Sequence, residues 1–147
     1  MSSIATLAVS RLVDRSPLNR WLGMHVISAD DYGVLLGIKW REELISNPDV
    51  RSTHGGILAT LIDAGADYAV ALKVGAPVPT IDLHVDYHQM AGPGDLRVEG
   101  KVIHLGARIA VAHARVFDMS GELVASGRGL YRVPTRQGVE PKKNSIA

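Results

Sequence analysis

Two carboxylates lie inside the most apolar stretch of the chain. Residues 54–75 read HGGILATLIDAGADYAVALKVG, and few side chains in that run besides Asp63 and Asp67 are polar. Such a segment predicts a buried helix, in which a carboxylate is unfavourable unless it is paired, hydrogen-bonded or used in chemistry. A helix aligns Thr60, Asp63 and Asp67 on one face because they are spaced i, i+3 and i+7. We interpret Asp63 as a candidate catalytic residue, and we keep a chemical and a subunit-facing role equally open for Asp67.

The start of this helix is the second chemical feature. His54, Gly55 and Gly56 open it, and the first N–H groups of a helix have no partner within the helix and lie at its positive end. Glycine lets a ligand approach these groups, which can polarise a carbonyl oxygen. Gly55 and Asp63 are separated by about 12 Å along a helix, too far to act on one carbonyl. A site that uses both therefore needs two subunits. His54 is interpreted as fixing the loop, with catalysis as the alternative.

Composition excludes several function classes. The chain has 147 residues with 46% apolar and 21% charged side chains, a net charge of +1 and no cysteine. These values predict one soluble domain and argue against a nucleic-acid groove, a membrane-binding patch, a disulfide or a thiol nucleophile. The N-terminal residues do not resemble a signal peptide, so we expect a cytoplasmic protein.

The elements expected around the central helix define an α+β fold. We predict helices over 4–13, with Ile4, Leu7, Ala8 and Leu12 inward, and over 17–22, a hairpin of strands 24–29 and 34–40, a polar loop over 41–53, and strands 80–89, 96–104, 109–118 and 123–133 in an antiparallel meander. One curved sheet wrapped around the helix makes a single domain over 1–133. A polar tail follows over 134–147. The sheet covers only part of the helix, so a second copy is expected to cover the rest.

The remaining polar clusters have weaker signals. His84, Asp86 and His88 share one strand face. Successive members of this set are two residues apart and therefore about 7 Å from each other, so a solvated or interface face is favoured over a metal site. Asn47 begins an Asn-Pro-Asp turn, and a turn is favoured over an amide that contacts a ligand. Glycines 127 and 129 inside the last strand indicate a bulge or a close backbone approach. Arg108 and Arg128 carry charges that could bind phosphate, although lone arginines on strand faces are more often solvated.

Together these residues resemble a known family. Asn47, the His54-Gly55-Gly56 start, Asp63 on the helix, and the strand TIDLHVDY from Thr80 are similar to the hotdog-fold acyl-CoA thioesterases of the PaaI type over roughly residues 19–133. The resemblance implies a homodimer, commonly paired into a homotetramer, that hydrolyses acyl-CoA without metal or cofactor.

The resemblance also implies roles for individual residues. The Gly55 N–H polarises the thioester carbonyl, and Asp63 of the other subunit acts as general base or nucleophile. Asn47 places the water or the thioester, and Thr80 supplies an assisting hydroxyl. Gly106, Arg108 and Arg128 are assigned to the CoA moiety by position.

Two other functions remain open on the sequence. One is a non-catalytic acyl-CoA-binding or accessory protein of the same fold. The other is a hotdog dehydratase, which uses a catalytic histidine with an acid. The dehydratase is disfavoured because no histidine follows His54 on the helix.

Overall fold

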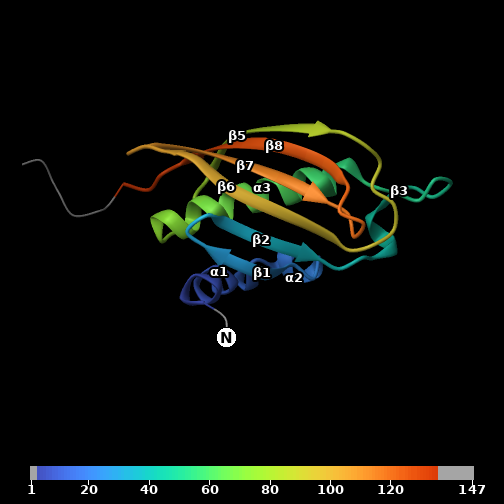
Figure 1. The fold of residues 1–147 in the computed structure, drawn as a ribbon, viewed down its shortest axis with the longest axis horizontal. Coiled ribbons are helices and arrows are strands. Elements are labelled where there is room, and N and C mark those ends of the chain that lie inside the picture. The colour runs from blue at the N-terminus through green and yellow to red at the C-terminus, as the bar shows by residue number, and fades with distance from the viewer. Residues whose placement is uncertain (1–2, 136–147) are drawn as a thin grey trace, which may run out of the picture.

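The central helix α3 (Gly55–Val74) is enclosed by a six-stranded antiparallel sheet (Figure 1). This computed structural model describes residues 3–135, so the predicted tail over 134–147 lies almost wholly outside the described residues. The sheet strands are β1 (His25–Asp30), β2 (Gly33–Ile38), β5 (Thr80–Tyr87), β6 (Leu96–Leu105), β7 (Ile109–Phe117) and β8 (Leu123–Arg132). Two further helices, α1 (Ile4–Arg15) and α2 (Pro17–Trp21), precede them. The predicted α+β hotdog fold is confirmed.

Local signals at both ends define α3. The His54 ring caps its start by accepting a hydrogen bond at Nδ1 from the Gly56 N–H at 2.8 Å. Its end is Gly75, whose φ of 74° is the left-handed conformation in which glycine terminates helices. The Gly75 N–H donates to the Ala71 carbonyl. The predicted helix is therefore confirmed to within a residue at each end.

Glycines allow α3 and the sheet to touch backbone to backbone. A Cβ atom placed on Gly100 of β6 would lie 1.8 Å from the carbonyl oxygen of Gly65 on α3. On β8, a Cβ at Gly127 would lie 2.6 Å from Ile62 Cγ2 and 2.4 Å from the His84 carbonyl oxygen. The expected close approach at Gly127 is confirmed, and it brings the helix side chains against β8.

Strand order differs from the predicted meander. The sheet runs β1-β2-β6-β7-β8-β5. Of the four strands predicted to form the meander, β6, β7 and β8 are neighbours in chain order, whereas β5 crosses to the far side and pairs with β8. The meander was wrong for β5 because alternation reveals a strand but not the sheet edge that it joins. In the described part of the chain no strand pairs with the other edge of β5.

The predicted polar loop over 41–53 contains structure of its own. A 3-10 turn, η1 (Glu42–Leu44), leads into a small hairpin of β3 (Ile45–Asn47) and β4 (Ser52–Thr53), which projects beyond the start of α3 (Figure 1). Asn47 Oδ1 accepts a hydrogen bond from the Asp49 N–H at 2.9 Å, so its turn role is confirmed. The Thr53 N–H donates to the Ala91 carbonyl at 2.7 Å and anchors the hairpin.

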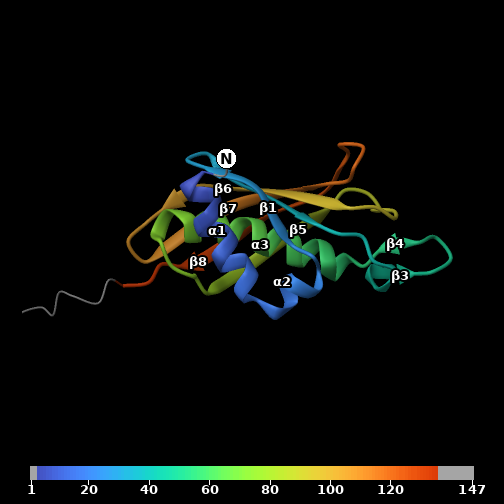
Figure 2. The ribbon, with the colours of Figure 1, turned by 90° about the horizontal axis from the view of Figure 1, so that it is seen from below.

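The face of α1 that packs inward is not the predicted one. Val9 and Val13 are fully buried, whereas Ile4 is 88% exposed. A hydrogen bond explains the difference, because Thr6 Oγ1 accepts from the Ala29 N–H of β1 at 3.1 Å. This contact orients the face of α1 that carries Thr6, Val9 and Val13 toward the sheet. The helices α1, α2 and α3 lie on the same side of the sheet (Figure 2).

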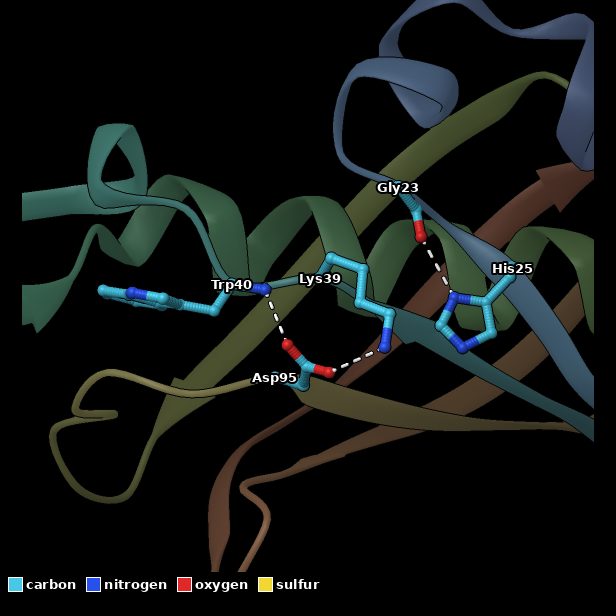
Figure 3. A network of polar contacts seen from close by, with 5 residues as sticks. All are labelled: Gly23, His25, Lys39, Trp40 and Asp95. Atoms are coloured by element: carbon cyan, nitrogen blue, oxygen red, sulfur yellow. Dashed lines mark hydrogen bonds and ion pairs between the residues drawn. The ribbon is translucent and has the colours of Figure 1, made fainter.

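A carboxylate joins the end of β2 to the start of β6. Asp95 accepts hydrogen bonds from the Trp40 N–H at 2.7 Å and from Lys39 Nζ at 3.1 Å, while His25 Nδ1 contacts the Gly23 carbonyl oxygen beside them (Figure 3). The Trp40 N–H is the largest influence that lowers the pKa of Asp95. The Asp95 contacts tie β2 to β6, next to the edge strand β1.

Candidate functional site

The Asp63 carboxylate is held through one oxygen only. Its Oδ1 accepts a hydrogen bond from Thr80 Oγ1 at 3.0 Å and another from the Tyr131 hydroxyl at 3.0 Å. Within residues 3–135, Oδ2 has no hydrogen-bond partner, and Asp63 is only partly buried. An ionised carboxylate with one oxygen fixed and the other open can take a proton from water or attack a carbonyl carbon.

Tyr131 is the site residue that the sequence analysis missed. It is fully buried, and its hydroxyl also lies 3.2 Å from the Asp63 backbone carbonyl. Burial raises the pKa of Tyr131, and the charge of Asp63 raises it further, so the phenol stays protonated and donates. The signal for Tyr131 in the sequence is strand periodicity, which places this residue on the same inward face of β8 as Gly129.

Asp67 lies one helical turn beyond Asp63 on the same face. Its Oδ1 is buried and has no hydrogen-bond partner among the residues described here. Burial, and secondly the nearby charge of Asp63, raise the pKa of Asp67 to about 7. The stripe therefore carries a second carboxyl that gains its charge only near neutral pH.

The helix start offers one free amide. The Gly56 N–H donates to His54 Nδ1, which gives the ring a structural role, as interpreted from the sequence. The Gly55 N–H has no hydrogen-bond partner in the described part of the chain. Across from it, the Tyr87 hydroxyl donates to the Gly55 carbonyl oxygen at 2.9 Å and holds the first turn against β5.

Strand β5 connects both halves of the site. Thr80 at its beginning bonds Asp63, and Tyr87 at its end bonds Gly55. Gly55 and Asp63 of α3 thus contact opposite ends of β5. This is consistent with their separation of about 12 Å along the helix. One subunit does not bring the free amide and the carboxylate together.

The other candidate residues lie in three separate places. Asn47 is in the projecting hairpin near the helix start. Gly106 and Arg108 lie in the β6–β7 turn, and the Arg108 carbonyl accepts from the Val133 N–H at 2.8 Å, at the sheet end where β5 begins. Arg128 belongs to the outer face, 3.9 Å from Asp82, on the side of the sheet away from α3. The structure places Arg108, but not Arg128, near the end of the sheet that holds Asp63.

The outer face of the sheet has a hollow of about 720 Å³, and its lining includes His84, Asp86, Lys101, His113 and Arg128. His84 Nε2 lies 3.2 Å from Asp86 Oδ1. Among residues 3–135 no group of three or more histidine or acidic side chains is arranged to hold a metal ion. No helix in this part of the chain is long and apolar enough to cross a membrane.

A family model described as the thioesterase superfamily matches residues 52–125, which include α3, β5 and β6. The chain belongs to this superfamily. A protein of Halobacterium salinarum that carries the provisional name of an esterase is 38% identical over 140 residues, 88% of this chain and 92% of that protein.

Two solved structures have the same fold, and the first is of a protein from the thioesterase superfamily. An X-ray structure of one member is 68% identical, has a TM-score of 0.89, and covers 90% of this chain and 100% of that one. PaaI from the phenylacetic acid degradation operon of E. coli has a TM-score of 0.80 with 21% identity, over 88% of this chain and 93% of its own. The expected hotdog thioesterase family is confirmed, and its named relatives support a hydrolase that acts on thioesters or esters.

Proposed function

We propose that the protein hydrolyses acyl-CoA thioesters at a centre shared by two subunits. The observation that carries this proposal is the Asp63 carboxylate, whose Oδ1 is held by two hydroxyls while Oδ2 stays open. Superfamily membership supports thioester hydrolysis, and the free Gly55 amide supplies the donor that a developing oxyanion needs.

The edge of β5 supports a homodimer. β5 pairs with β8 on one side only, and its outer edge has no partner strand within residues 3–135. Ile81 is 53% exposed and Tyr87 is 55% exposed along this strand, and an exposed edge with apolar side chains favours pairing with another strand. Antiparallel pairing of two β5 strands about a two-fold axis would bring Thr80 of one copy near Tyr87 of the other. Since Thr80 bonds Asp63 and Tyr87 bonds Gly55, the two halves of the centre would meet. Two such dimers would form the proposed homotetramer.

In the proposed reaction, Asp63 Oδ2 accepts a proton from a water molecule whose oxygen attacks the thioester carbonyl carbon. The carbonyl oxygen gains negative charge, which the Gly55 N–H of the partner subunit stabilises. The C–S bond then breaks, the acid is released, and the CoA thiolate takes up the proton. In the alternative route Asp63 attacks the carbonyl carbon directly, the C–S bond breaks and CoA thiolate leaves, and water then hydrolyses the resulting acyl-Asp63 anhydride to the free acid and the Asp63 carboxylate.

Further residues have supporting roles in this proposal. Thr80 fixes the Asp63 carboxylate, and His54 keeps the helix start in place. Asn47 orients the water or the thioester from the projecting hairpin. Gly106 and Arg108 bind the CoA moiety near the start of β5, with Arg128 as a more distant cation.

The test is thiol release from a panel of acyl-CoA esters by the wild type and by Asp63→Asn. The asparagine variant should fold normally and lose about 100-fold or more in turnover, as expected for removal of a general base. Asp31→Asn, in an exposed turn, is the matched control and should be unaffected. Equal turnover by Asp63→Asn would refute the proposal. Tight acyl-CoA binding by the wild type without thiol release would instead identify a non-catalytic binding protein.

A further inference from the structure

We propose that Tyr131 is a positioning residue that orients the Asp63 carboxylate, and that Gly129 is required to make room for it. This inference rests on the proposed hydrolysis. Its basis is the meeting of two hydroxyls, from β5 and β8, on a single oxygen of Asp63.

Gly129 and Tyr131 form one unit on the inner face of β8. A Cβ atom at position 129 would lie 2.2 Å from the Tyr131 hydroxyl oxygen and 2.3 Å from its Cε2. The phenol therefore lies back along the strand, directly over the glycine. Any side chain at 129 would push the ring out of this path and away from Asp63.

The contact does more than satisfy a buried hydroxyl. The Tyr131 hydroxyl has one proton, which it shares between Asp63 Oδ1 at 3.0 Å and the Asp63 carbonyl at 3.2 Å. These two acceptors belong to the same residue, so the phenol restrains both the backbone and the side chain of Asp63. With Thr80 on the same Oδ1, the carboxylate is restrained through that oxygen, and Oδ2 has no hydrogen-bond partner within residues 3–135.

Other groups also act on this carboxylate. They are Asp67 and Tyr68 on α3 and Tyr131 on β8, while β5 contributes the neutral Thr80 hydroxyl. Asp67 is the only further carboxyl among them. The pH profile is therefore best measured in an Asp67→Asn background, in which Asp63 is the sole acid of the stripe.

The primary test is Tyr131→Phe, which keeps the ring and removes the donor. We expect kcat to fall about 10-fold or more with KM changed by less than about three-fold, because an interaction needed for the reacting geometry is lost. The acid limb of the kcat profile should move to higher pH, since the ionised carboxylate loses a hydrogen-bond donor. An unchanged kcat and an unmoved acid limb would overturn the inference.

Gly129→Ala tests the second part, because it leaves the tyrosine in place and removes its space. It should reproduce the loss in kcat and the shifted acid limb. Gly92→Ala is the matched control, since a Cβ at Gly92 meets nothing within 4 Å. A Gly129→Ala variant with normal kcat would refute the role of the glycine.

A fluorotyrosine placed at position 131 keeps the test decisive if Tyr131→Phe does not fold. Fluorine makes the phenol a stronger donor at nearly the same shape, so the acid limb should move to lower pH, opposite to the Phe variant. No movement would contradict the inference. A carbon-13 NMR titration of the Asp63 carboxyl should show the same displacement without any substrate. If the wild type hydrolyses nothing but this displacement is seen, the proposed function fails while the positioning contact stands.

Discussion

Replacing Gly55 by proline removes the proposed oxyanion donor with little other change. Gly55 is the first residue of α3, where proline is favoured because its missing N–H has no helical partner. His54 has φ −59° and ψ 131°, close to the polyproline II conformation, which is compatible with a following proline. The helix and its cap should therefore survive the substitution, while the free amide is lost.

The expected effect is that of one lost oxyanion donor. Removal of such a donor reduces kcat by about 100- to 1000-fold, or about 2.7–4 kcal/mol of transition-state stabilisation. A steric contribution is also present, since a Cβ at Gly55 would lie 3.3 Å from Tyr87 Cε1. That contact is the same for alanine, which retains the N–H, so Gly55→Ala separates the two effects.

The assay compares kcat for thiol release by Gly55→Pro, Gly55→Ala and the wild type, with circular dichroism to verify the helix. The proline variant should lose most of its activity. The alanine variant should be clearly more active than the proline variant, because alanine keeps the N–H although its methyl group narrows the approach to that amide. If both variants lose activity equally, or if the folded proline variant retains it, the Gly55 amide is not the donor.

Two further predictions concern stability. The pKa of Asp67 is about 7 in the folded protein, compared with an ordinary value of 3.8. Between pH 4 and 7 the unfolded chain therefore loses this proton while the folded protein keeps it. As a result, the free energy of unfolding falls as the pH rises through this range. Asp67→Asn should remove this dependence and be about 2–4 kcal/mol more stable at pH 8 in urea unfolding; identical pH curves for the two proteins would contradict the burial argument. Gly100→Ala should be destabilised by about 3 kcal/mol or more because its Cβ would collide with the Gly65 carbonyl, whereas Gly92→Ala should unfold at the wild-type urea concentration. A Gly100→Ala protein as stable as the control would show that α3 and β6 are less closely packed than described.

Features encoded locally could be predicted from the sequence. The limits of α3 depend on His54 and Gly75, which are adjacent to the helix in the chain. The separation of Gly55 and Asp63 follows from the helix rise alone, and it predicts that a site using both residues is shared between two subunits.

Features that depend on contacts distant in sequence could not be predicted. The contact between Tyr131 and Asp63 joins residues 68 positions apart, and nothing near Tyr131 marks its partner. The pairing of β5 with β8 rather than β6 is equally non-local. On α1 apolar residues occur on more than one face, and the hydrogen bond from Ala29 to Thr6 selects the face that is buried.

Mixing two inactive variants tests the shared centre most directly. Asp63→Asn supplies an intact Gly55 amide, and Gly55→Pro supplies an intact Asp63 carboxylate. Coexpressed in equal amounts, about half of the dimers should be mixed, and each mixed dimer has one intact centre out of two. The prediction is that thiol release recovers to about a quarter of the wild-type rate. Activity no greater than the sum of the two separate variants would contradict a centre built from two subunits.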